Sequence, residues 1–86
     1  MYSEKYSDRI TRKLSKIYKK DSNHYKIVTK KIDWILANPN HKYKYLRYDM
    51  KGQTRIHIGH FVLVFTIDHK RKIISFDDYD HHDKVY

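Results

Sequence analysis

Residues 54–76, TRIHIGHFVLVFTIDHKRKIISF, decide the fold of this chain. Their apolar and β-branched residues alternate with a period of two, which is typical of β-strands. The pattern predicts three strands, over 54–58, 61–67 and 73–76, joined by a tight glycine turn and by a charged turn. Strands with such short connections form an antiparallel meander.

The sequence that precedes the meander has the apolar spacing of two helices. Apolar residues recur at helical spacing over 7–20 and again over 24–37. A polar turn separates the two segments, Ser22 or Asn23 is expected to cap the second helix, and Pro39 ends it. The fold class expected is therefore α+β, with an N-terminal helical hairpin packed on one face of a small antiparallel β-sheet. The first six residues predict an extended lead-in or an edge strand.

Length and composition narrow the class of protein. A chain of 86 residues predicts a single domain over 1–86. The absence of Cys excludes disulfide frameworks, thiol nucleophiles and Cys-based zinc sites, and it fits a cytoplasmic protein. No run of residues has the length of a membrane span, and the N-terminus lacks the apolar region of a signal peptide. We therefore expect a cytoplasmic location and no contact with membranes.

The charge is distributed unevenly. Residues 1–55 hold fifteen Lys or Arg and five Asp or Glu, a net of +10, whereas residues 56–86 hold four and five, a net of −1. Five of the seven histidines lie in the second part. A basic field of this size attracts nucleic acid or an acidic protein, although the helix lysines by themselves are explained equally well by a solvated helical face.

The chain ends in a polar cluster whose members are Tyr79, His81, His82, Asp83, Lys84 and Tyr86. Imidazoles titrate near neutral pH and a phenol can donate or orient a proton, which is what proton-transfer chemistry requires. The competing interpretation is a zinc or nickel site that would combine the histidines and Asp83 with His57 or His60. Adjacent histidines on an extended tail point to opposite sides, however, so no metal ligand is expected here.

The order and spacing of these elements resemble the RelE/ParE superfamily of toxins. The resemblance rests on the helical hairpin ending in Asn-Pro, the basic loop ending in Lys51-Gly52, the Arg-Ile-His-Ile-Gly segment from Arg55, and the terminal Tyr86. It implies a RelE-like mRNA interferase of a type II toxin–antitoxin system, which is a ribosome-dependent endoribonuclease that promotes attack of the ribose 2′-hydroxyl without metal. The implied partners are a cognate antitoxin, the ribosome and mRNA, with no small-molecule cofactor.

Matching the family's motifs implies catalytic roles for Arg55, His81, His82 and Tyr86. Val62 departs from the pattern, because it stands where the family has an Arg that stabilises the transition state. Removing one such donor can cost ~10²–10³ in rate. The departure favours the alternative of a non-nucleolytic toxin that resembles ParE and inhibits DNA gyrase by binding it, whereas the His-His-Tyr terminus argues against that alternative. A plain basic nucleic-acid-binding module is the other alternative.

The basic loop would supply further contacts to RNA, with cations for phosphates and aromatic rings for unpaired bases. Lys44, Arg47 and Lys51 are the expected phosphate ligands, and Tyr43, Tyr45 and Tyr48 the stacking residues. The same side chains could instead cap the edge of the sheet, and the histidine pair could contact an antitoxin or lie in a solvated tail.

Overall fold

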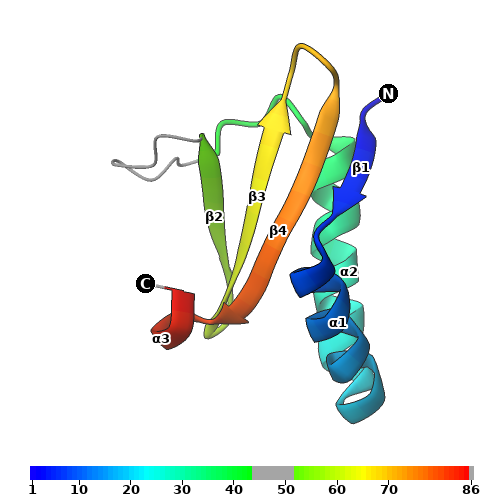
Figure 1. The fold of residues 1–86 in the computed structure, drawn as a ribbon, viewed down its shortest axis with the longest axis vertical. Helices are drawn as coiled ribbons and strands as arrows, with labels where there is room; N and C mark the ends of the chain where they lie inside the picture. The colour runs from blue at the N-terminus through cyan, green and yellow to red at the C-terminus, as the bar shows by residue number, and fades with distance from the viewer. Residues whose placement is uncertain (44–51, 86) are drawn as a thin grey trace.

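The computed structural model describes residues 1–43 and 52–85, the last by its backbone alone. Figure 1 shows the elements in chain order: β1 (Ser3–Tyr6), α1 (Asp8–Lys20), α2 (Ser22–Ala37), β2 (Gln53–Ile58), β3 (Phe61–Asp68), β4 (Ile73–His81) and α3 (His82–Val85). Across the described ranges, no helix is long and apolar enough to cross a membrane.

The sheet confirms the predicted meander and extends it by one strand. Its order is β1-β4-β3-β2, with β2 antiparallel to β3 and β3 antiparallel to β4. The first residues of the chain form the edge strand β1, which pairs with β4 in parallel, so Ser3 lies opposite Ile73. The sheet is therefore mixed, although its three consecutive strands are antiparallel as expected.

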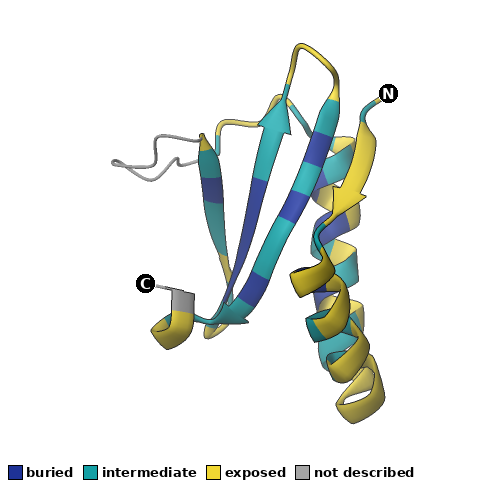
Figure 2. Cartoon of the chain, in the orientation of Figure 1, coloured by how far each residue is buried: buried dark blue, intermediate teal, exposed yellow. Residues whose placement is uncertain are grey.

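Both long helices lie on one face of the sheet, which confirms the α+β class (Figure 1). Figure 2 shows buried positions alternating with more exposed ones along β4, whereas four consecutive residues of β3, Val62–Phe65, are buried. The core joins the apolar stripes of α1 and α2 to the inward positions of β3 and β4: Ile10, Val28, Ile32, Ile35, Leu63, Phe65, Ile74, Phe76 and Tyr79.

The prediction that the last strand ends at Phe76 was wrong, because β4 continues to His81. A β-bulge explains the error: Phe65 pairs with Phe76 while Val64 pairs with Asp78, so Asp77 is an extra residue. The bulge shifts the alternation by one position. Tyr79, which the sequence grouped with the polar terminal cluster, consequently faces the helices and is 1% exposed.

The bulge also anchors the start of α1. Ser7 caps this helix, accepting a hydrogen bond from the backbone N–H of Ile10, and its hydroxyl donates to the carbonyl oxygen of Asp77 at 2.6 Å. Thr66 Oγ1 donates to the Asp77 carboxylate at 2.9 Å from the neighbouring strand. These bonds bring α1 beside the second half of β4, which β1 does not cover.

The predicted N-cap of the second helix was wrong, because the capping residue lies one position before Ser22. Asp21, rather than Ser22 or Asn23, caps α2 by accepting a hydrogen bond from the backbone N–H of His24. Its own N–H donates to the carbonyl of Ile17 in α1. One residue with extended backbone therefore ends the first helix and begins the second, which leaves no separate turn.

Candidate active site

The face of the sheet that α1 and α2 leave uncovered carries two cross-strand rows of mixed character. Arg55 on β2 lies opposite Val64, which lies opposite Asp78 on β4. In the next row His57, Val62 and Asp80 are paired in the same way. Each row thus runs from a basic or titratable group, across a buried valine, to a carboxylate. We call this surface the helix-free face because neither of the two long helices covers it; the short helix α3 borders it.

Arg55 lines a hollow of about 250 Å³ on this face, together with Lys84 of α3 and Arg9 of α1. The hollow is completed by Gln53, Val64, Asp77 and Asp78. Three cations from three separate segments of the chain therefore surround one space. A phosphate group would find donors there, because Arg and Lys are the residues that bind phosphate in proteins.

The carboxylates of β4 are paired with a cation from α1. Lys13 donates to Asp78 at 2.6 Å and to Asp80 at 2.8 Å, and Arg9 lies 3.7 Å from Asp78. Burial opposes the charged form of Asp80, but the hydrogen bonds from Lys13 and from the backbone N–H of His81 lower its pKa below the usual range. Lys13 thus offsets negative charge that would otherwise repel an anionic ligand beside the hollow.

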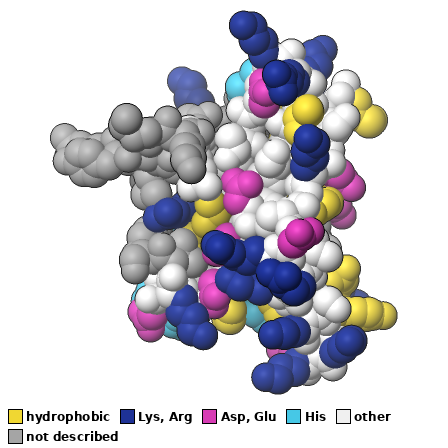
Figure 3. Space-filling model, in the orientation of Figure 1, with side chains coloured by type: hydrophobic (Ala, Val, Ile, Leu, Met, Phe, Trp, Pro, Cys, Tyr) yellow, Lys and Arg dark blue, Asp and Glu magenta, His cyan; other side chains and the backbone are white. Residues whose placement is uncertain are grey.

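Sequence reasoning missed this pairing. Lys13 is 65 and 67 residues away from its two partners, and it belongs to a run of cations along α1 that look alike in the sequence. Figure 3 shows many Lys and Arg side chains around the lower end of the helices, with acidic side chains beside some of them. Only the course of α1 past the edge of β4 distinguishes Lys13 from its neighbours.

The two terminal histidines lie where β4 ends and α3 begins. The rings of His81 and His82 stack with centroids 4.5 Å apart and planes 30° from parallel. The backbone N–H of His82 donates to the carbonyl of His60 at 2.9 Å, which fixes the start of α3 against the turn between β2 and β3. Both imidazoles are partly exposed, and two residues later Lys84 reaches the hollow that Arg55 lines.

The expectation that adjacent histidines diverge was therefore wrong. It assumed an extended tail, whereas β4 ends at His81 and α3 begins at His82. At such a junction successive side chains no longer alternate across a strand. The structure brings the two imidazoles together instead of separating them.

Tyr43 is held by protein contacts. Its ring meets Phe65 edge-on at 5.2 Å, and its hydroxyl donates to the carbonyl of Asn38 at 2.9 Å. Burial raises the pKa of this phenol. Packing accounts for Tyr43 without RNA, so its stacking role stays a prediction that these contacts do not favour. The other expected site residues of the loop and terminus lie outside the described residues: Lys44, Tyr45, Arg47, Tyr48, Lys51 and Tyr86.

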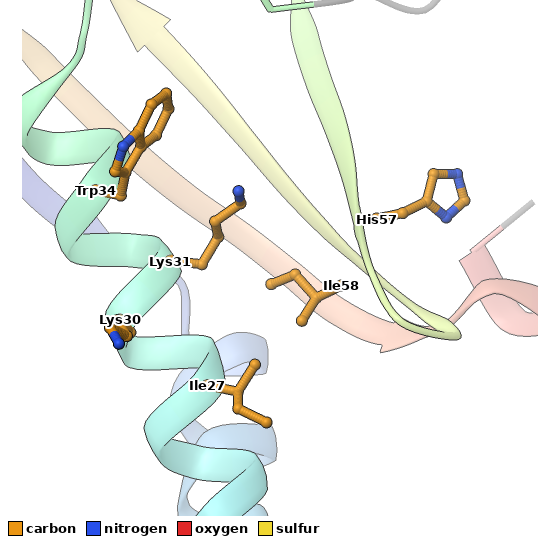
Figure 4. Close-up of a pocket in the computed structure, with 6 residues that line it drawn as sticks. All are labelled: Ile27, Lys30, Lys31, Trp34, His57 and Ile58. Atoms are coloured by element: carbon orange, nitrogen blue, oxygen red, sulfur yellow. The ribbon is translucent and has the colours of Figure 1, made fainter.

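A groove of about 360 Å³ separates α2 from β2 on the other side of the molecule (Figure 4). Ile58 points into it from β2, and the neighbouring His57 also lines it, although its ring points away from α2. On the helix, Trp34 is 42% exposed and Ile27 is 56% exposed, with Lys30 and Lys31 beside them. The groove is thus apolar within and basic at its rim. It lies beside β2, which is an edge strand of the sheet.

Two known proteins resemble this chain in sequence over its whole length. The whole chain aligns over 87 residues, at 40% identity, with 92% of a Methanocaldococcus jannaschii protein named "Putative toxin RelE4". The chain belongs to the RelE toxin family. It is also 44% identical over 87 residues to a Methanosarcina mazei protein, with both sequences covered completely. No family model matches the chain.

Solved RelE structures share the fold. The isolated Escherichia coli RelE toxin superposes with a TM-score of 0.78 at 17% identity, covering 94% of this chain and 84% of that one. The archaeal RelE–RelB complex from Pyrococcus horikoshii gives a TM-score of 0.71 at 16% identity, covering 98% of both chains. At these identities the superpositions support the fold of this RelE-family toxin and not the chemistry of its site.

Proposed function

We propose that this RelE-family protein is the toxin of a type II toxin–antitoxin system and cleaves mRNA on the ribosome. The observation that carries the proposal is the hollow on the helix-free face, where Arg55 and Lys84 lie together. The stacked imidazoles of His81 and His82 begin the same short helix that carries Lys84. Lys84 thus links the cations of the hollow to the two histidines at the start of α3.

The proposed reaction uses no metal. A base removes the proton of the ribose 2′-hydroxyl, and the 2′-oxygen forms a bond to the adjacent phosphorus. The bond from phosphorus to the 5′-oxygen breaks, and an acid protonates that oxygen, leaving a 2′,3′-cyclic phosphate and a free 5′-hydroxyl. His81 or His82 serves as base or acid, Arg55 stabilises the charge on phosphorus, and Tyr86 donates or orients a proton.

The basic loop would hold the RNA beside this site. Lys44, Arg47 and Lys51 are proposed to bind phosphates, and Tyr45 and Tyr48 to stack on bases. Substitutions can separate phosphate binding from base stacking. Losing a phosphate contact should weaken RNA binding by an amount that depends on salt concentration. Losing a stacking residue should weaken binding with less dependence on salt.

The decisive experiment is a ribosome toeprint assay on a translated mRNA. Wild-type protein should produce cleavage in the ribosomal A site, and His82→Ala should lower its rate by ~10²–10⁴. Tyr86→Phe, Arg55→Ala and Arg47→Ala should also lower it. His69→Ala is the matched control, because His69 lies in the turn at the far end of β3 and β4. Full cleavage by a triple variant with His81→Ala, His82→Ala and Tyr86→Phe would remove the terminal cluster from the active site.

We propose that the partner is an acidic antitoxin. Solved structures with this fold include toxin–antitoxin complexes, among them the RelE–RelB complex from Pyrococcus horikoshii. The chain's net charge of +9 attracts an acidic segment, and the groove between α2 and β2 offers apolar contacts through Trp34 and Ile58. The antitoxin is also expected to cover the neighbourhood of residues 47–55.

This partnership predicts a salt-dependent affinity. Raising the salt concentration should weaken binding of the antitoxin, because screening acts on exposed charges. Trp34→Ala should weaken it at every salt concentration, whereas Tyr18→Ala, an exposed aromatic residue on α1, should not. Isothermal titration at low and high salt measures both effects. An affinity that is unchanged by salt would show that electrostatics does not hold the pair together.

A second candidate function is inhibition of DNA gyrase by binding, and one observation favours it. Val62, at the position of the family's catalytic Arg, is fully buried. No guanidinium therefore projects from that position to stabilise a transition state. A supercoiling assay separates the two functions: inhibition of gyrase without mRNA cleavage would support the second candidate and reject the first.

A further inference from the structure

The strand-to-helix junction at the C-terminus gathers ligands of the kind that bind transition metals. His81, His82 and Asp83 can each offer one ligand atom such that all three atoms lie within 4.8 Å of one another. Nδ1 of His81 is 3.4 Å from one carboxylate oxygen of Asp83, and Nδ1 of His82 is 3.1 Å from the other. The three side chains therefore converge on one side of the junction.

These separations suit a tetrahedral ion. Zinc binds imidazole nitrogen and carboxylate oxygen at roughly 2.0–2.2 Å, which places neighbouring ligand atoms of a tetrahedral site about 3.3 Å apart. The two contacts to Asp83 are close to that value but reach different carboxylate oxygens, so one imidazole must turn for both to share an ion with a single Asp83 oxygen. The remaining separation, between the imidazole nitrogens, can close by small rotations, because both rings are partly exposed and not locked in the core.

The lone pair of His81 already faces this space. The backbone N–H of Asp83 lies 3.3 Å from Nδ1 of His81, so Nδ1 accepts in the tautomer that carries its proton on Nε2. A neutral imidazole with Nδ1 unprotonated is the form that binds a metal. The ion would replace this weak hydrogen bond.

A further imidazole lies beside the junction. The ring centroid of His60 is 6.2 Å from that of His81 and 6.3 Å from that of His82, and the His60 carbonyl already accepts from the N–H of His82. His60 is exposed in the turn between β2 and β3, so its side chain can rotate toward the ion. A bound metal would then join α3 to that turn.

We propose that His81, His82 and Asp83 bind a divalent transition-metal ion of the zinc type, with His60 completing the coordination. This site goes beyond the proposed function, and its existence does not depend on it. One consequence does rest on the proposed function: an ion on the Nδ1 atoms would take lone pairs that proton transfer needs, so zinc would inhibit cleavage and a chelator would restore it.

The test is a zinc titration of the full chain without an affinity tag, in the absence of ribosomes and RNA. Wild-type protein should bind one zinc ion per chain, measured by calorimetry or by competition with a chromogenic chelator. His82→Asn and Asp83→Asn should each lower the affinity at least about tenfold, since losing even an outer-shell partner typically costs about 10–100-fold. His69→Asn removes one exposed imidazole elsewhere and should leave the affinity unchanged.

Cobalt provides a second readout of geometry. Co²⁺ in a tetrahedral nitrogen and oxygen site absorbs visible light strongly, so wild-type and His69→Asn proteins should develop this absorption and Asp83→Asn should not. Circular dichroism confirms that each variant is folded. Equal zinc affinity in wild-type protein and in a His82→Asn, Asp83→Asn double variant would overturn the proposal. Zinc binding by a chain that never cleaves mRNA would reject the proposed function and leave the metal site standing.

Discussion

The two faces of the same sheet follow different rules. On the face that α1 and α2 cover, Leu63, Phe65 and Phe76 are fully buried, and their apolar character predicts where they lie. On the helix-free face, Val62 and Val64 are also buried, yet they lie between Arg55 or His57 and the carboxylates of β4. Alternation assigns residues to a face, but it does not predict how the charges on that face are paired.

The largest expected effect on stability comes from removing a core side chain on the face that α1 and α2 cover. Phe65→Ala should lower the free energy of unfolding by about 3–5 kcal/mol, because it removes a fully buried ring from the core cluster to which both helices contribute. His57→Ala, exposed on the other face, should change it by about 0.5 kcal/mol or less. Urea unfolding measures both values, and similar losses would contradict the distinction between the faces.

The next largest effect concerns a buried position of β3 on the helix-free face. Val62→Arg should lower the free energy of unfolding by on the order of 3 kcal/mol, because the guanidinium would enter a fully buried position. His57→Arg is the matched control, since His57 is the exposed cross-strand partner of Val62 and tolerates a long cation. A Val62→Arg variant with unchanged stability and faster mRNA cleavage would show instead that this position opens toward the RNA.

The smallest effect concerns the charge pairing across the edge of β4. Lys13→Met should lower the free energy of unfolding by about 1 kcal/mol at neutral pH, because the partners are partly exposed and solvent weakens the pairing. Lys16→Met, exposed on the same helix, should have almost no effect. Urea unfolding of the three proteins provides the comparison.

The effect of Lys13 should also depend on pH with a definite sign. The pKa of Asp80 is lowered in the folded state, so its pairing stabilises the protein above the ordinary Asp pKa of 3.8. That stabilisation is lost as the pH falls through the lowered pKa. The difference between wild-type protein and Lys13→Met should therefore shrink below about pH 4. A constant difference down to strongly acidic pH would show that Lys13 acts through packing alone.

Local sequence patterns predicted a helix or strand correctly where the spacing of its apolar residues matches the side that is buried. The meander and the two helices follow from periodicity and short-range chemistry. The prediction of β4 was wrong at the point where Asp77 bulges, since one extra residue reverses the alternation and makes Tyr79 a core residue. The bulge depends on contacts from β3 and from the start of α1, which no window of β4 contains.

The sequence by itself determined the strands, the helical hairpin, the excess of positive charge and the chemistry available at the terminus. Those properties depend on side-chain type and on neighbours a few residues away. Only the tertiary structure decided that Lys13 pairs with Asp78 and Asp80, and that His81 and His82 stack instead of diverging. The physical reason is that both arrangements depend on where distant segments meet: α1 runs along the edge of β4, and the turn before β3 holds the start of α3.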